Sequence, residues 1–302
     1  MNMTPVVRRN AWIAFAAVCL IWGTTFLAIK IALETIPPFL MGGIRYLIAG
    51  VLLALWLLVR GQTMPPVREW GRLAMLGFLM ITLGNGGVVW AQQYLASGLT
   101  AIVIATSPFW MVAIDAWLPG ADRLSPRQWG GLLIGFLGIV MLVWPDISLG
   151  GVTGRGVVLG VLSVQVACIA WAIASAYTRR HSMSRNVLGV AAVQMFFGGL
   201  FMTLAGTAMG EWPHLAFSPR TLASLVYLTV AGSVVAFTAY SYALRHLPIA
   251  TVSLHTYVNP VIAVALGTLL LGEPFRVSMI AAALVIVVGM LVVRPVRRPS
   301  RA

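Results

Sequence analysis

The stretch WIAFAAVCLIWGTTFLAIKIAL occupies residues 12–33 and contains a single charged side chain, Lys30. An α-helix rises about 1.5 Å per residue, and the hydrocarbon core of a bilayer is about 30 Å thick. A run of this length therefore predicts a helix that crosses a membrane. Arg8 and Arg9 precede it as in a signal peptide, but the run is too long for one, so we expect a retained helix.

Nine further apolar runs follow along the chain, separated by proline, glycine and charged residues. Together with the first, they predict an all-α integral membrane protein with ten transmembrane helices. The connection between the third and fourth runs is the least distinct. The nine runs occupy residues 39–59, 73–91, 100–118, 128–144, 157–177, 187–209, 222–243, 249–271 and 277–293.

The composition agrees with a membrane protein and limits its partners. Of the 302 residues, 60% are hydrophobic and 9% are charged, whereas about 25% of residues are charged in soluble domains. The net charge of +13 is typical of nucleic-acid binders, but the bases are spread between apolar runs, so we expect a lipid bilayer and no nucleic acid. Cys19 and Cys168 lie inside apolar runs and predict neither a disulfide framework nor a metal site. We expect no cofactor.

The distribution of basic residues predicts the orientation of the chain. If the N-terminus is cytoplasmic, fifteen of the twenty Lys and Arg residues fall in cytoplasmic loops and tails, and three, Arg155, Arg220 and Arg276, fall outside. Cytoplasmic loops of membrane proteins carry an excess of positive charge. We therefore expect a multi-pass protein with both termini in the cytoplasm and an even number of spans.

The two halves of the chain resemble each other. Five spans in each half is an odd number, so residues 1–150 and 151–302 are expected to be repeats of opposite topology. Inverted repeats are typical of alternating-access carriers, whose substrate sites lie near the membrane midplane. The matching pairs are Cys19 with Cys168 and Trp22 with Trp171 at an offset of 149, Ser107 with Asn259 at 152, and Asp122 with Glu273 and Gly138 with Gly289 at 151.

Several motifs resemble the EamA-type repeats of the drug/metabolite transporter superfamily, and the sequence looks closest to its bacterial YedA-like members. The resemblance implies ten helices and a carrier of the bacterial inner membrane, commonly an exporter of amino acids or other small metabolites. Residues 119–122 depart from the Leu-Gly-Glu pattern of the second repeat, so Asp122 matches Glu273 less well. The motifs are Trp22-Gly23-Thr24, Lys30, Pro37-Pro38, Gly84-Asn85-Gly86, Arg45, Pro108, Tyr257-Val258-Asn259-Pro260 and Leu271-Gly272-Glu273-Pro274.

Three charged residues fall within predicted spans. An ionisable side chain at membrane depth is costly and is a functional candidate by default. We interpret Lys30 and Arg45 as anchors at the outer interface or as salt-bridge partners, with Glu34 within reach. For Asp115, which lies seven residues after Pro108, two interpretations stay open: a site for a coupling proton or cationic group, and a partner for an arginine of the inner loops.

His255 lies on a polar stripe that leads to Pro260. Thr251 and Asn259 are four residues away on either side and therefore share its helix face. An ordinary histidine titrates near pH ~6.5, so His255 is a candidate to carry a coupling proton or to donate to a substrate carboxylate; the alternative is a histidine satisfied by a neighbouring helix. Pro108 and Pro260 break helical hydrogen bonding, and we expect both near the central pathway.

Trp22 and Trp171 lie too deep for the aromatic belts of a membrane protein. We expect them to form walls of a substrate pocket, the alternative being that they only fill the bundle. Amide and aromatic side chains of other spans complete the prediction. The candidate substrate-binding residues are Trp22, Asn85, Gln92, Gln165, Trp171, Tyr240, His255, Tyr257 and Asn259.

Two groups of glycines have different expected roles. Gly131, Gly135 and Gly138 have the spacing that permits close contact between helices. Gly84 and its neighbours Gly86 and Gly87 loosen the third run, and we interpret this segment as a hinge beside Asn85.

These features favour a secondary carrier that moves a small organic solute by alternating access, as a monomer or weak homo-oligomer. No phosphate-binding loop for ATP is present. The alternative is a multispan membrane enzyme acting on a lipid or isoprenoid. Such an enzyme needs clustered reactive groups, whereas the seven acids of this chain are scattered.

Overall fold

The computed structural model describes residues 4–117, 124–148, 151–181, 186–247, 249–252 and 254–293. All regular secondary structure in these ranges is helical. Eight helical segments are long and apolar enough to cross a membrane, and two shorter apolar helices follow them. The prediction of a ten-helix all-α membrane protein is confirmed.

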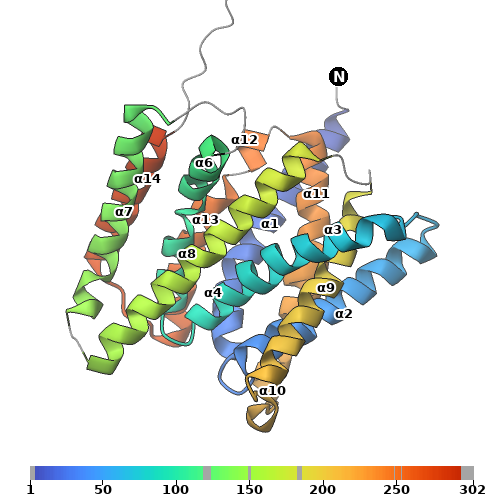
Figure 1. Ribbon diagram of the computed structural model, residues 1–302, viewed down its shortest axis with the longest axis horizontal. Helices are drawn as coiled ribbons and strands as arrows, with labels where there is room; N and C mark the ends of the chain where they lie inside the picture. Colours follow the sequence, from blue (N-terminus) through green and yellow to red (C-terminus); the bar gives the residue numbers. More distant parts are fainter. Residues whose placement is uncertain are drawn as a thin grey trace, which may run out of the picture.

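Five spans come from the first half of the chain and five from the second (Figure 1). The first five spans are α1 (Pro5–Ala32), α2 (Pro38–Val59), α3 (Val67–Gly77) continued by η1 (Phe78–Asn85) and α4 (Gly86–Ala91), α5 (Ser97–Ile104) with α6 (Ser107–Trp117), and α7 (Pro126–Ile147). The others are α8 (Gly151–Arg180), α9 (Val187–Ala208), α10 (Pro219–Tyr227) continued by η3 (Leu228–Val235) and α11 (Ala236–His246), α12 (Ile249–Val252) with α13 (His255–Leu271), and α14 (Val277–Val293); η2 (Trp212–His214) is a 3-10 turn between spans.

Helix ends extend beyond the apolar runs because polar residues cap them. α1 begins at Pro5, well before the run at residues 12–33, since the side chain of Thr4 accepts a hydrogen bond from the backbone nitrogen of Val7. Ser125 and Gln128 form a capping box at the start of α7. Gly272 ends α13 with φ of 64°, a conformation that glycine adopts without steric cost.

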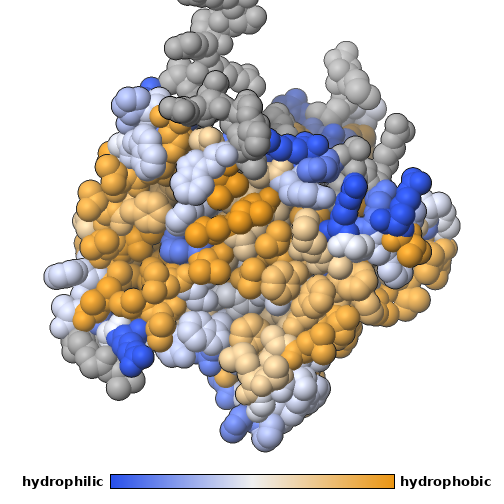
Figure 2. Space-filling model, viewed as in Figure 1, coloured by the Kyte–Doolittle hydropathy of each residue, from blue (hydrophilic) through white to orange (hydrophobic). Residues whose placement is uncertain are grey.

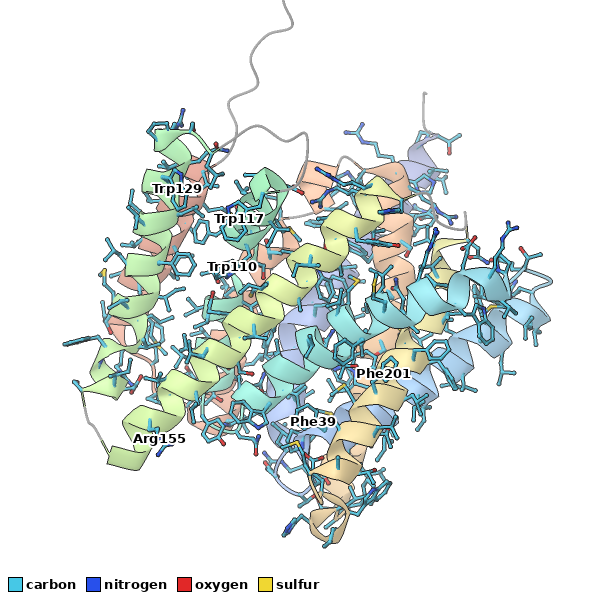
Figure 3. All side chains as sticks on the ribbon, in the orientation of Figure 1. Phe39, Trp110, Trp117, Trp129, Arg155 and Phe201 are labelled. Atoms are coloured by element: carbon cyan, nitrogen blue, oxygen red, sulfur yellow. The ribbon has the colours of Figure 1, made fainter. Side chains whose placement is uncertain are left out.

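The surface is that of a membrane protein. Figure 2 shows hydrophobic residues forming a band across the middle of one face, with hydrophilic residues gathered toward both ends. Figure 3 places Trp117 and Trp129 at one end of the molecule and Arg155 at the other. Trp117 and Trp129 are 79% and 52% exposed, as expected for aromatic side chains at a membrane interface.

Glycines bring two repeat-related pairs of helices into close contact. A Cβ atom added to Gly289 of α14 would lie 2.6 Å from the backbone nitrogen of Gly135 in α7. Likewise, a Cβ atom on Gly199 of α9 would lie 2.5 Å from the backbone nitrogen of Leu47 in α2. The packing role predicted for the glycines of α7 is confirmed, and the α7–α14 pair stands at one side of the bundle (Figure 1).

Two spans contain a π-helical turn that the sequence analysis did not predict. η1 begins at Phe78 and η3 at Leu228, so the offset is 228 − 78 = 150, as expected for repeat-related elements. π-Helical segments are rare and frequently mark functional sites. The loosened segment predicted around Gly84 thus has a definite geometry, and the second repeat contains its counterpart.

The fourth span, in which a break was predicted at Pro108, is interrupted just before it, at Ala105 and Thr106. The hydroxyl groups of Thr106 and Ser107 donate to the carbonyl oxygens of Val103 and Ile104, both at 2.7 Å. Pro108 then falls in the first turn of α6, where no backbone N–H is needed. Pro260, in contrast, lies inside α13. Asp122 and residues 119–121 lie outside the described residues.

Candidate functional site

Four rings from three helices meet around Trp22. The centroid of its indole ring lies 5.0 Å from that of His255, 5.1 Å from that of Tyr240 and 5.6 Å from that of Phe237. Trp22 belongs to α1, His255 to α13, and the other two to α11. These distances are typical of interacting aromatic pairs. We call Trp22, Phe237, Tyr240 and His255 the Trp22 cluster; it unites three of the predicted site residues.

A hydrogen bond fixes the indole of Trp22 against the π-helix of the second repeat. Its Nε1 donates to the carbonyl oxygen of Gly232 at 3.2 Å. Within α1, Thr25 donates to the carbonyl oxygen of Trp22 at 2.7 Å. The hydroxyl groups of Thr24 and Tyr227 are also hydrogen-bonded, so α1 is tied to the α10–η3 segment at two positions.

Asn259 joins α13 to α1 beside this cluster. With its amide nitrogen facing the backbone carbonyls, it donates to Cys19 at 3.2 Å and to His255 at 2.9 Å. Nδ1 of His255 lies 2.8 Å from the carbonyl oxygen of Val252, which places the proton of the neutral ring on Nδ1 and makes Nε2 an acceptor. Two residues of the predicted stripe, His255 and Asn259, thus lie at the Trp22 cluster.

The repeat provides a counterpart of the contact between Trp22 and the π-helix. A Cβ atom on Gly84 of η1 would lie 3.3 Å from Cε3 of Trp171 in α8. Trp22 and Trp171 thus each pack on a glycine in the π-helix of the opposite repeat. The offsets are 171 − 22 = 149 for the tryptophans and 232 − 84 = 148 for the glycines.

Gln165 belongs to a second polar cluster rather than to the Trp22 cluster. Its Oε1 accepts a hydrogen bond from Nε1 of Trp110 at 2.7 Å, and its amide contacts Thr106 at 3.4 Å. Figure 3 labels Trp110 on α6, between the α7–α14 pair and α8. Nearby, Ser107 and Cys168 are hydrogen-bonded at 3.2 Å, which is the repeat counterpart of the contact between Asn259 and Cys19.

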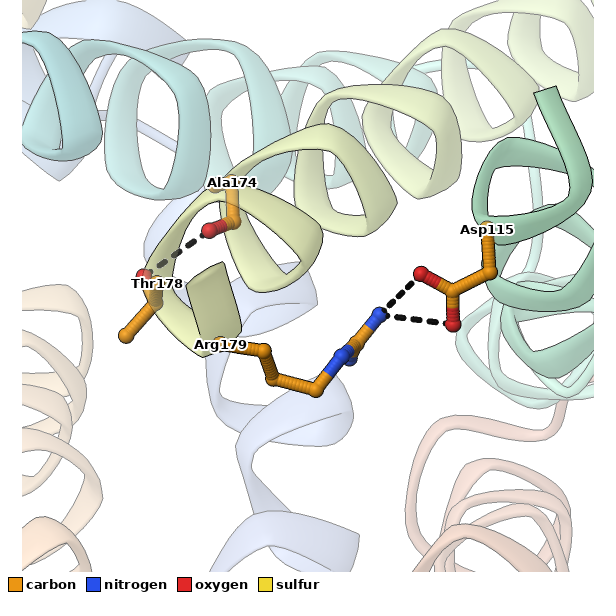
Figure 4. Close-up of polar contacts among 4 residues, drawn as sticks. All are labelled: Asp115, Ala174, Thr178 and Arg179. Atoms are coloured by element: carbon orange, nitrogen blue, oxygen red, sulfur yellow. Dashed lines mark hydrogen bonds and ion pairs between the residues drawn. The ribbon is translucent and has the colours of Figure 1, made fainter. Parts of the chain in front are cut away.

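Asp115 forms an ion pair with Arg179 at the ends of α6 and α8 (Figure 4). Both carboxylate oxygens accept from Nη2 of Arg179, at 2.6 and 2.8 Å, and both side chains are 49% exposed. Thr178 is bonded to Ala174 within α8 and takes no part. Of the two interpretations of Asp115, this geometry matches the pairing with an inner arginine.

The expected approach of Lys30 to Glu34 is corrected by the structure. Its Nζ donates to the carbonyl oxygens of Gln92 and Leu95 at 2.5 and 3.0 Å, where α4 ends. Cations are favoured at helix C-termini because the last carbonyl groups lack helical partners. Glu34, expected within reach of Lys30, instead pairs with Arg220 at 3.2 Å.

Arg45 is too deeply buried to be an interface anchor, and it forms no salt bridge within the described residues. It is 3% exposed, and its Nε donates to the hydroxyl of Ser233 in η3 at 2.9 Å. The guanidinium carbon lies 4.6 Å from the ring centroid of Tyr46. The expectation failed because α2 packs so closely on its neighbours that Arg45 cannot reach the surface.

Besides Gln165 and Trp171, three further predicted site residues lie away from the Trp22 cluster. Asn85 donates to the carbonyl oxygen of Met80 within its own span at 3.1 Å. The side-chain amide of Gln92 is buried and has no hydrogen-bond partner among the residues that the structure describes. The hydroxyl of Tyr257 contacts Met290 of α14.

Tyr257 and Pro260 line a groove of 640 Å³ between α13 and α14. Its walls are almost entirely apolar, and Ile102 of α5 and Phe275 close part of it. Pro260 thus faces this groove. Asn259, on the same helix, instead contacts α1 beside the Trp22 cluster. The position expected for Pro260, near the central pathway, therefore fits Asn259 better.

Comparison with known proteins agrees with this architecture. The model of the EamA-like transporter family matches residues 10–144 and, a second time, residues 158–294. The chain belongs to the EamA-like transporter family. A solved crystal structure shares the fold, with a TM-score of 0.63, 21% identity, and coverage of 94% of this chain and 96% of the other.

Curated relatives of this EamA-like chain carry transporter names. "Uncharacterized inner membrane transporter YedA" of Escherichia coli is 34% identical over 261 residues, which cover 86% of this chain and 82% of the relative. "Uncharacterized transporter YvbV" of Bacillus subtilis is 25% identical over 302 residues, 100% of this chain and 96% of the relative. The resemblance seen in the sequence motifs is confirmed, and the protein is a multi-pass membrane transporter.

Proposed function

We propose that this EamA-like transporter is a secondary carrier that moves an amino acid or a related small metabolite across the bacterial inner membrane by alternating access, in the outward direction. The Trp22 cluster is its substrate site, with Asn259 as a polar neighbour. The paired packing of Trp22 on Gly232 and of Trp171 on Gly84 carries this proposal. Each contact joins one repeat to the other, and carriers of inverted topology bind their substrates where the repeats meet.

The remaining assignments belong to the same proposal. Residues 1–150 and 151–302 form the two inverted repeats, both termini are cytoplasmic, and the chain acts as a monomer or weak homo-oligomer. His255 carries a coupling proton, because its Nε2 is an acceptor and its ring lies in the Trp22 cluster. Asp115 is the second candidate to carry the coupling proton, since its carboxylate already binds Arg179.

The separate partners of the carboxylates support transport rather than catalysis on a lipid. Glu34 pairs with Arg220, and Asp146 pairs with Arg276. Glu211 accepts from backbone nitrogens at the start of α2. Each of these acids is therefore bound to a separate partner at the ends of the helices, whereas general acid-base or metal-assisted chemistry needs acids that converge on one place.

Solute flux into and out of proteoliposomes tests the proposal. We expect purified wild-type protein to accelerate the flux of at least one solute from a panel of amino acids and related metabolites. Trp22→Ala and His255→Ala lower that flux at least tenfold, whereas Trp117→Ala, which removes an exposed tryptophan, leaves it within twofold. Equal flux in all four proteins contradicts the assignment of the site, and no flux of any solute contradicts the carrier.

A further inference from the structure

Arg45 is a buried cation for which the described part of the chain provides no counter-charge. It is 3% exposed, yet none of the ion pairs within the described residues includes it. Its Nε has a partner in Ser233, a neutral hydroxyl, and its guanidinium lies over the ring of Tyr46. A hydroxyl and an aromatic ring replace only part of the hydration that a guanidinium loses on burial.

The described carboxylates of the extracellular half are committed elsewhere. Glu211 caps the start of α2, where its Oε2 accepts from the backbone nitrogen of Leu40 at 2.8 Å. Glu273 caps the start of α5, where it accepts from the backbone nitrogen of Ser97 at 2.8 Å. Neither of these carboxylates binds Arg45, so among the described residues the guanidinium has no acidic partner.

Gly232 allows the guanidinium of Arg45 to pack closely against η3. A Cβ atom at this position would lie 3.3 Å from Nη2 of Arg45 and 3.0 Å from Cγ2 of Thr25. The carbonyl oxygen of the same glycine accepts the hydrogen bond from Trp22. Arg45 and Trp22 therefore both contact Gly232, which places the guanidinium one residue away from the Trp22 cluster.

We propose that Arg45 binds the carboxylate of the carried solute while the Trp22 cluster holds its apolar or aromatic body. This inference rests on the proposed carrier function and specifies the chemistry of its substrate. A guanidinium presents paired N–H donors that match the two oxygens of a carboxylate. The ring faces of Trp22, Phe237 and Tyr240 offer an apolar wall to the rest of the molecule.

The experiment compares carboxylates with their own amides. The probes are phenylacetate and indole-3-acetate, their primary amides, and phenethylamine, and the readout is the ligand-induced shift of Tm of the purified protein. We expect the carboxylates to stabilise the wild-type protein at concentrations at least tenfold lower than the amides or the amine. Arg155→Gln, which removes an exposed arginine at the far end of α8, keeps this preference.

Two substitutions of Arg45 decide the outcome. Arg45→Gln is expected to abolish the preference for carboxylates, and Arg45→Lys to retain part of it, because an ammonium keeps the charge but lacks the paired donors. If Arg45→Gln does not fold, Arg45→Lys alone must weaken carboxylate binding at least threefold relative to amide binding. A wild-type protein that treats every carboxylate like its amide, or a preference that survives both substitutions, overturns the proposal.

Flux measurements separate this inference from the carrier proposal. If the protein binds carboxylates through Arg45 but transports no solute, the anion site is supported and the carrier proposal is contradicted. If Arg45→Gln transports neutral or cationic solutes at the wild-type rate, the carrier proposal is supported and the anion site is contradicted.

Discussion

The indole nitrogen of Trp22 donates to the carbonyl oxygen of Gly232 at 3.2 Å, and Trp171 packs on Gly84 in the related place of the other repeat. Both glycines belong to π-helical segments. Because a π-helix displaces one residue from the regular ladder, its carbonyl groups are open to side chains of neighbouring helices. The Trp22 contact uses such a carbonyl, so one side chain couples α1 to the second repeat.

The two tryptophans are expected to differ in their tolerance of phenylalanine. Trp22→Phe keeps most of the ring but removes the donor to Gly232, whereas the contact of Trp171 with Gly84 consists of ring carbon atoms. We therefore expect Trp22→Phe to lower solute flux at least fivefold and Trp171→Phe to lower it less than twofold. Flux in proteoliposomes with matched protein content measures both, and equal losses would show that the hydrogen bond is unimportant.

Helix count, order and repeat relationship were predictable from the sequence, because each span must contain about 20 apolar residues and little else. The small-residue contacts of α7 followed from the spacing of Gly131, Gly135 and Gly138 for a similar reason. Of the site, His255, Tyr240 and Trp22 were predicted, and they meet as expected. Phe237 was not among the predicted site residues.

Long-range polar contacts were not predictable in the same way. The glycines around Gly84 predict a loosened segment, but the π-helices are as apolar as an α-helical span such as α2, so nothing local marks their geometry. The partners of Lys30, Arg45 and Glu34 depend on how helices distant in the chain cross. The glycines at 84 and 232 carry a signal that the sequence analysis missed, because their offset of 148 is close to that of the two tryptophans.

Gly289 sets the distance between α7 and α14. A Cβ atom there would lie 2.6 Å from the backbone nitrogen of Gly135, so an added methyl group would force the two helix backbones apart. We expect Gly289→Ala to destabilise the protein by about 1–3 kcal/mol, as overpacked cores do. Gly130→Ala is the matched control, since no atom lies within 4 Å of its added Cβ. Thermal unfolding in detergent measures both, and equal Tm values would contradict the packing role.

The ion pair of Asp115 and Arg179 is expected to contribute little to stability. Both side chains are half exposed, and exposed pairs typically contribute about 0.2–1 kcal/mol. A double-mutant cycle with Asp115→Asn and Arg179→Gln should therefore give a coupling energy below about 1 kcal/mol. We also expect Asp115→Asn to retain at least one third of wild-type flux. A complete loss of flux in Asp115→Asn, not restored by adding Arg179→Gln, would instead favour the coupling role.

Glu211 is expected to contribute more to stability than an exposed glutamate. It is 8% exposed, and its carboxylate accepts hydrogen bonds from the backbone nitrogens of Phe39 and Leu40, where α2 begins. Hydrogen bonds to a charged group contribute about 1.5–3 kcal/mol, and Gln offers one acceptor oxygen with an amide group that faces the second donor. Glu211→Gln should therefore lower Tm by several degrees. Glu34→Gln, which removes only an exposed pair with Arg220, should lower it much less. Equal shifts of Tm in the two variants would mean that water replaces the hydrogen bonds that Glu211 forms at the start of α2.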